Sequence, residues 1–203
     1  MRKIHMKKDQ FTMPRLYFKY GTMGSSKSAQ ALMCQFNYQQ KGMKVMLVKP
    51  SLDNRGDDET PMVRSRIGLK SECLTISHEE SFIDMFNNYK QQNGCDCIIV
   101  DEAQFCTSKQ IEELKQLTAQ VPVLCYGLLT DFTCKLFEGS KRLVELADSL
   151  QEIKSVCKCG HKATVNARFI NGKCVDDGPV VFIGGDEAYE NMCWWCWQEE
   201  LNK

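Results

Sequence analysis

The stretch "YGTMGSSKSAQALM", residues 20–33, places a lysine and a serine after a run of small side chains. Gly21, Lys27 and Ser28 match the spacing G-x-x-x-x-G-K-[ST], with Ser26 in place of the second glycine. In such a loop, backbone N–H groups and the positive end of the following helix bind phosphates. Lys27 would reach the outer phosphates and Ser28 would hold Mg²⁺. The alternative is a turn of small residues with an ordinary surface lysine.

The serine at position 26 tests this interpretation. Glycine before the lysine lets the backbone approach a ligand closely. Ser26 fits if its φ angle is negative, because only a positive φ makes glycine nearly obligatory.

Two acidic residues end the apolar segment "IIVDEAQF", residues 98–105. A phosphate-loop fold places its second Mg²⁺-organising acid at the end of such a strand, so Asp101 is the candidate. Glu102 is the candidate general base, because neighbouring strand residues face opposite sides. The alternative is a pair of solvated acids at a strand end.

Twelve cysteines are many for a chain without a secretory signal, and in a reducing cytosol clustered cysteines indicate metal binding or catalysis. The segments "CKCG" and "CWWC" near the C-terminus supply four thiolates for a closed, structural Zn²⁺ site. These four are Cys157, Cys159, Cys193 and Cys196. His161 and Cys174 are alternative ligands, and buried cysteines without metal are the alternative for the whole set.

The remaining cysteines are scattered among apolar residues, and we expect them to be small buried side chains. They are Cys34, Cys73, Cys95, Cys97, Cys106, Cys125 and Cys134. The tryptophans of "WWCW" could form a stacking surface, but packing against the main domain is the simpler expectation.

Composition limits the possible partners. Acidic and basic residues balance at 26 each, which gives no electrostatic case for a nucleic-acid polymer or a membrane surface. No apolar run approaches the roughly 18 residues of a membrane helix. The basic N-terminus lacks an apolar region after it, so we expect a loose leader and a cytoplasmic protein.

The surrounding segments alternate between strand and helix, which predicts a parallel sheet. Strands are expected at 15–20, 44–50, 72–76, 121–127 and 152–156, and within 95–105. Ala29, Leu32, Met33 and Phe36 recur with helical spacing and predict one buried helix face, with Gly42 as the stop. The polar segments 51–71 and 128–139 are expected to be loops, the first of them long and mobile.

Three further helices are predicted. Ser77 and Glu80 form a capping-box pattern before an apolar helix face. That face would carry Phe82, Met85, Phe86 and Tyr89. Thr107 and Gln110 form a second capping box, opening a helix to about residue 120, and the third helix spans 140–148.

Together these patterns predict an α/β fold: a phosphate-loop kinase domain with a parallel sheet and a small C-terminal zinc-binding domain. The expected organisation is a leader at 1–14, an ATP-binding domain at 15–156 and a small zinc-binding domain at 157–203. The last segment is too short for a core of its own, so a metal would stabilise it.

The runs "LYFKYGTMGSSKS", "VDEAQF", "YGLLTDF", "CKCGHKAT" and "VVFIGGDEAYENMC" resemble the cellular-type (type II) thymidine kinases. The similarity covers about residues 15–198. The resemblance implies transfer of the γ-phosphoryl group of ATP to the 5′-hydroxyl of thymidine or deoxyuridine in pyrimidine salvage. It also implies a homotetramer and feedback inhibition by dTTP.

The resemblance further implies roles for individual residues. ATP would contact Gly21, Thr22, Met23, Gly24, Ser25, Ser26, Lys27, Ser28, Asp101, Glu102, Ala103 and Gln104. Glu102 would take the proton of the 5′-hydroxyl group. The nucleoside would contact Met23, Asp53, Arg55, Phe105, Phe132, Val180, Val181, Phe182, Ile183, Gly184 and Tyr189. The resemblance also implies zinc binding by the four cysteines of the two C-terminal pairs.

The sequence departs from the family pattern in a few places. Ser26 replaces a common glycine, Trp194 and Trp195 stand where a basic residue often follows the cysteine, and C-x-C replaces C-x₂-C. Two other classes of function stay open on the residues alone. One is a nucleotide-binding switch or zinc scaffold without kinase activity, and the other is an ATP hydrolase in which Glu102 activates water.

Overall fold

The computed structural model describes residues 15–51, 60–179 and 188–203. Its centre is a six-stranded sheet in the order β5-β2-β6-β7-β1-β8, and every neighbouring pair is parallel. The strands are β1 (Leu16–Tyr20), β2 (Val45–Pro50), β5 (Leu74–Ile76), β6 (Cys97–Val100), β7 (Val123–Gly127) and β8 (Ser149–Glu152). The predicted parallel α/β sheet is confirmed.

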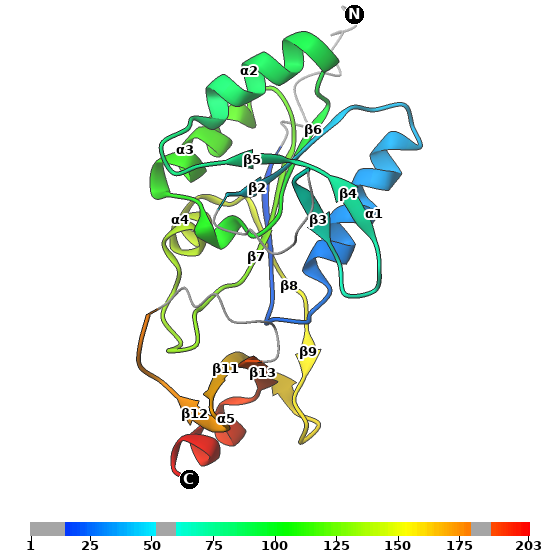
Figure 1. The fold of residues 1–203 in the computed structure, drawn as a ribbon. Coiled ribbons are helices and arrows are strands. Elements are labelled where there is room, and N and C mark those ends of the chain that lie inside the picture. The colour runs from blue at the N-terminus through cyan, green and yellow to red at the C-terminus, as the bar shows by residue number, and fades with distance from the viewer. Residues whose placement is uncertain (1–14, 52–59, 180–187) are drawn as a thin grey trace, which may run out of the picture.

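Helices cover both faces of the sheet (Figure 1). One face carries α1 (Lys27–Gln39), and the other carries α2 (Phe82–Asn93), α3 (Ser108–Leu117) and α4 (Glu138–Leu146). Strand alternation explains the two cores, because successive side chains point to opposite faces. In β6, Ile98 packs on the side of α2, α3 and α4, whereas Ile99 packs on the side of α1. Across the described ranges, no helix is both long and apolar enough to span a bilayer.

The buried face of α1 differs from the prediction. Ala29 and Leu32 are buried as expected, but 53% of Met33 and 58% of Phe36 is exposed. The sheet side is instead formed by Ala31, Leu32 and the polar Gln35, among others. Small side chains let the helix approach the strands closely, so apolar spacing alone gave the wrong face.

The apolar face predicted for α2 is confirmed, since Phe82 and Phe86 are fully buried. The predicted start is wrong, because Ser81 caps this helix through its side chain rather than Ser77. Ser77 N–H does donate to Glu80 Oε2 at 2.6 Å, but that bond closes the preceding turn.

Two segments hold strands in places other than those predicted. The expected loop at 51–71 contains part of an antiparallel hairpin, β3 (Met62–Arg64) and β4 (Lys70–Glu72), in which only Val63 is buried. The strand predicted at 152–156 is divided between edge strand β8 and the short β9 (Ser155–Val156). Both misplacements concern exposed strands, whose polar residues give little periodic signal.

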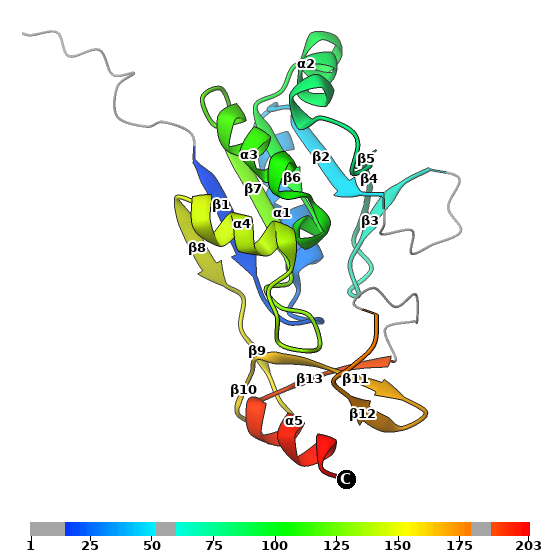
Figure 2. The same cartoon turned by 90° about the vertical axis from the view of Figure 1, so that its left-hand side faces the viewer.

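The C-terminal part forms a small module at the carboxyl ends of the sheet strands (Figures 1 and 2). Its elements are β9, β10 (Lys162–Ala163), β11 (Val165–Ile170), β12 (Lys173–Val175), β13 (Tyr189–Met192) and α5 (Trp194–Leu201). Trp197 is 4% exposed and packs within the module, whereas Trp195 is 76% exposed. Trp197 therefore lies in the core of the module, against which Cys134 of the preceding domain also packs, whereas Trp194 and Trp195 are exposed.

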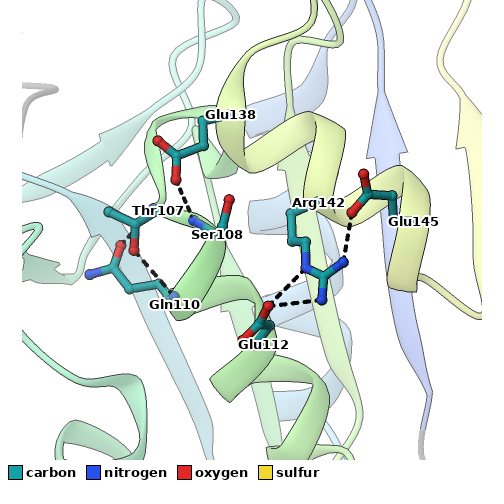
Figure 3. A network of polar contacts seen from close by, with 7 residues as sticks. All are labelled: Thr107, Ser108, Gln110, Glu112, Glu138, Arg142 and Glu145. Carbon is teal, nitrogen blue, oxygen red and sulfur yellow. Dashed lines mark hydrogen bonds and ion pairs between the residues drawn. The ribbon is translucent and has the colours of Figure 1, made fainter.

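A polar network connects the start of α3 with α4 (Figure 3). Glu138 Oε1 accepts the N–H of Ser108 at 2.7 Å. Arg142 donates to Glu112 Oε1 through Nε and Nη2, at 3.1 and 2.8 Å, and to Glu145 Oε2 at 2.6 Å. These contacts fix the helix pair that follows the acidic strand end.

Thr107 caps α3 as predicted, with both bonds of a capping box formed (Figure 3). Its hydroxyl accepts Gln110 N–H at 3.2 Å, and Gln110 Oε1 accepts Thr107 N–H at 3.0 Å. The cap holds the short 3₁₀ helix η2 (Ala103–Phe105) between β6 and α3.

Thr107→Ala is expected to lower the free energy of unfolding by about 1 kcal/mol, because the first turn of α3 loses its acceptor. Urea denaturation would measure this change. Thr107→Ser is the control, since it keeps the hydroxyl and should change stability by less than about 0.5 kcal/mol. Equal losses in both variants would contradict a capping role.

Candidate active site

The loop at 21–26 joins β1 to the N-terminus of α1, as the sequence predicts for a phosphate-binding loop. Lys27 is the first helical residue and is only 7% exposed. Its Nζ donates to Thr22 O at 2.7 Å, so the side chain turns back over the loop. The loop therefore places an ammonium group where phosphates would meet backbone N–H groups.

Glycine is required at the start of this loop. A Cβ at Gly21 would collide with the carbonyl oxygen of Ile153 and with the side chain of Ser25. Gly24 has a φ of +73° and lies against Arg66 and Asn191. The close packing explains why the pattern carries small residues there.

Ser26 corrects one expectation. Its φ is +66°, in the left-handed region, not negative as the sequence interpretation required. A side chain in that region costs roughly 1–2 kcal/mol relative to glycine. Such strain persists where surrounding contacts over-determine the backbone, so the loop is held from outside at other residues.

Asp101 directly follows β6 beside the loop, and the residue is 4% exposed. Burial, followed by the charge of Glu102, raises its pKa to about 7, although the Ser28 hydroxyl and Lys27 oppose this shift. Asp101 Oδ1 is buried without a hydrogen-bond partner among the described residues. A buried carboxylate oxygen beside a serine hydroxyl fits a Mg²⁺ ligand set.

Glu102 follows in a left-handed conformation, with φ +52°. Its Oε2 accepts Gln104 Nε2 at 2.6 Å, and Gln104 Oε1 accepts Leu128 N–H at 3.0 Å. Gly127 makes room for this arrangement, because a Cβ there would lie 2.7 Å from Gln104 Oε1. Gln104 thus orients Glu102. Gly127 was not predicted as part of the site, because its only signal was a glycine at a strand end.

The aromatic residues predicted to contact a base come from three segments: Phe105 ends η2, Phe132 lies in the loop after β7, and Tyr189 begins β13. Phe105 meets Phe137 edge-on, with ring centroids 5.7 Å apart. Phe132 is 2% exposed, and the fully buried Arg168 guanidinium lies 3.6 Å from the centre of its ring. Tyr189 pairs with Arg168 across β11 and β13, which places it on the same side of the module.

Several predicted site residues cannot be placed. Asp53, Arg55 and the segment Val180, Val181, Phe182, Ile183 and Gly184 lie outside the described residues. Phe137 was not predicted as part of the site, because its residue type alone does not distinguish a pocket wall from the core.

The four predicted cysteines form a compact group. Their sulfur atoms lie within 4.8 Å of one another, as tetrahedral coordination of one ion requires. Burial opposes ionisation of Cys157, but backbone N–H groups of Cys159 and Cys193 lower its pKa to about 7. Hydrogen bonds to Cys159 and Cys193 raise the pKa of Cys196, so without a cation the four thiols do not all ionise together. Thiolates are the form that binds zinc, so the donor set fits Zn²⁺.

The two alternative ligands lie outside this group. His161 Nδ1 is 3.2 Å from Cys159 Sγ, in hydrogen-bonding contact with a ligand rather than in the set itself. Cys174 lies on β12 and packs against the module core. Of the scattered cysteines, Cys95, Cys97, Cys106 and Cys125 are buried as expected, whereas Cys34, Cys73 and Cys134 are half-buried.

Ser26→Gly is expected to raise the free energy of unfolding by about 1 kcal/mol, because glycine adopts a positive φ without strain. Thermal or urea denaturation would measure the gain. Ser25→Gly is the matched control, since its φ is not positive and the same exchange there should lower stability. A loss of stability in Ser26→Gly would contradict the left-handed assignment.

The purified protein is expected to carry one zinc ion per chain, measured by mass spectrometry of the metal. Cys196→Ser removes one of four donors and should reduce zinc content below half an equivalent and destabilise the module. Cys174→Ser is the control and should keep the full equivalent. Equal zinc loss in both variants would contradict the four-cysteine site.

Comparisons with known proteins agree with this geometry. The family model described as thymidine kinase matches residues 14–197. A thymidine kinase of Zymomonas mobilis is 42% identical over 94% of this chain and 99% of its own length. Those of phage T4 and Lactococcus lactis are 41% and 43% identical, over 94% and 89% of this chain and 99% and 95% of theirs. The chain therefore belongs to the thymidine kinase family.

Proposed function

We propose that the protein transfers the γ-phosphoryl group of ATP to the 5′-hydroxyl of thymidine, and of deoxyuridine, giving dTMP in pyrimidine salvage. Membership of the thymidine kinase family supports the reaction class. The observation that carries the proposal is the position of Lys27 and Ser28 beside the carboxyl group of Asp101. Glu102 follows Asp101 in the chain, and Gln104 Nε2 donates to its carboxylate.

The phosphates of ATP would lie along Gly21–Ser28 and beside Asp101–Gln104. Ser28 and Asp101 would hold Mg²⁺, which when bound neutralises charge on the phosphates. Lys27 would exchange its bond to Thr22 O for one to a phosphate oxygen. The buried position of Lys27 and Asp101 favours this role, since electrostatic interactions are stronger away from water.

Glu102 would act on the nucleoside. Its carboxylate would accept the proton of the 5′-hydroxyl while the 5′-oxygen forms a bond to the γ-phosphorus. The bond from that phosphorus to the bridging oxygen breaks, and ADP leaves. Gln104 would keep Glu102 oriented through the 2.6 Å hydrogen bond.

The thymine base would lie among Met23, Phe105, Phe132 and Tyr189. Flat aromatic walls suit a planar base, because stacking combines apolar burial with defined geometry. Asp53, Arg55 and residues 180–184 would complete the site from segments outside the described residues.

We also propose a domain organisation, an oligomeric state and a location for the protein. We divide the chain into a leader at 1–14, an ATP-binding domain at 15–156 and a lasso domain at 157–203 that carries structural Zn²⁺. Separate hydrophobic cores support two domains, and β9, directly before residue 157, pairs with β10 of the module. We propose a cytoplasmic homotetramer inhibited by dTTP, without a nucleic-acid polymer or membrane as partner.

Incubation with Mg²⁺ and γ-labelled ATP, with and without each deoxynucleoside, tests the reaction. Label in dTMP only when thymidine is present is the expected result. Label only in free phosphate, independent of nucleoside, would identify a hydrolase instead. No release of label from folded, zinc-loaded protein would favour a binding protein without catalysis.

Glu102→Gln is expected to lower kcat by roughly 10²- to 10⁴-fold, the usual contribution of a general base. The KM for ATP should change little, because Gln keeps the size of the side chain. Glu112→Gln is the control, since Glu112 lies on the α3 surface network away from the loop. Near-normal turnover of Glu102→Gln would remove Glu102 from this role.

A further inference from the structure

Asn166 connects the C-terminal module to the phosphate loop. It lies on β11 and is 3% exposed. Its Oδ1 accepts the N–H of Met23 at 2.7 Å, and its Nδ2 donates to Thr130 O at 3.2 Å. The two partners require opposite ends of the amide, so a single orientation of the side chain satisfies both.

The direction of the side chain follows from the strand. Val165 and Ala167, the neighbours of Asn166 on β11, are buried in the core of the module. Because strand residues alternate between faces, Asn166 points out of the module toward the phosphate loop. A polar residue at this position therefore does not disturb the module core, and its side chain is free to hydrogen-bond to residues outside the module.

Two further contacts reach the same part of the loop. Asn191 is the cross-strand partner of Asn166, and its Nδ2 lies 3.2 Å from the position of a Cβ on Gly24. Ser155, at the start of β9, forms a hydroxyl–hydroxyl hydrogen bond with Thr22. Three consecutive loop residues are thus each contacted by a residue from the C-terminal side of the chain.

We infer that Asn166 is a positioning residue, which holds the phosphate loop from the zinc-bearing module in the form that binds ATP. The inference rests on the proposed function for the identity of the ligand. Among these contacts, only the Asn166 amide binds both the backbone of the loop and the segment that carries Phe132. It therefore sets the distance between the phosphate side and the base side of the site.

The strain at Ser26 explains why such a support is needed. A loop with a left-handed serine has a higher free energy than a relaxed loop. It keeps this conformation only when contacts from other parts of the protein hold it. Without the Asn166 bond, the partly buried N–H of Met23 loses its partner and the loop gains freedom to relax. ATP would then have to order the loop on binding, which weakens its affinity.

Asn166→Ala is expected to raise the Kd for Mg²⁺·ATP about 10-fold, measured by titration calorimetry of the full zinc-loaded chain. In turnover with thymidine, the KM for ATP should rise by a similar factor while kcat falls less. Val165→Ala is the matched control, because it weakens the module core on the same strand without touching the loop. Its Kd should stay within about twofold of the wild-type value.

A double-mutant cycle with Ser26→Gly separates positioning from a general loss of structure. If the Asn166 bond offsets strain at Ser26, adding Ser26→Gly to Asn166→Ala should lower the Kd for Mg²⁺·ATP at least about threefold relative to Asn166→Ala alone. Equal zinc content in all variants would confirm that the module is intact. An unchanged Kd in Asn166→Ala, an equal loss in Val165→Ala, or strict additivity in the cycle would each overturn the inference.

The calorimetric arm also distinguishes this inference from the proposed function. A wild-type protein that binds Mg²⁺·ATP but phosphorylates no deoxynucleoside would refute the kinase proposal. Weaker ATP binding by Asn166→Ala in that same protein would still support the positioning role. A wild-type protein that binds no ATP would overturn both.

Discussion

The site depends on the end of strand β7, where Gly127 has no side chain. Its carbonyl accepts Gly21 N–H at 3.3 Å, which fixes the start of the phosphate loop. The missing side chain leaves space for Gln104. Its Oε1 accepts the N–H of Leu128, and its Nε2 donates to Glu102 Oε2. Because β7 lies between β1 and β6, this one gap sets the separation between the loop and the acids. Any side chain at this position would push the two halves of the site apart.

Several residues near Gly127 adopt conformations or environments that lower the stability of the fold. Ser26 and Glu102 both adopt left-handed backbone conformations, and Asp101 is buried with a raised pKa. Each is unfavourable for the free protein, and each would become useful if a phosphate and a cation bind there as we propose. The sheet and its helices supply the compensating stability, since their apolar residues fill both faces. Strain of this kind is expected where function, rather than stability, fixes the residue.

Site residues could be predicted from the sequence where they lie close together in the chain. The loop motif, the acids after an apolar strand and the cysteine pairs depend on neighbours in the chain, so their positions could be predicted. The sign of φ at Ser26 could not, because contacts from β9, β11 and β13 hold the loop. Asn166 was missed for the same reason, since an asparagine within an apolar strand has no local signature.

The errors in the fold have a common physical origin. Met33 and Phe36 continue an apolar spacing, yet they are exposed, and smaller side chains of α1 are buried. Ser77 and Glu80 formed a local bond, but tertiary packing of Phe82 placed the helix start at Ser81. In both cases the local pattern was real, and packing across elements decided which part of it was used.

The bond between Met23 and Asn166 also has a consequence for slow motions of the chain. The N–H of Met23 is held by a side chain that is almost completely buried, on a different module. It exchanges with solvent deuterium when this bond breaks, which includes every event in which the module separates from the loop while both parts stay folded. The exchange rate of this single amide would therefore report how often the two parts of the molecule open relative to each other.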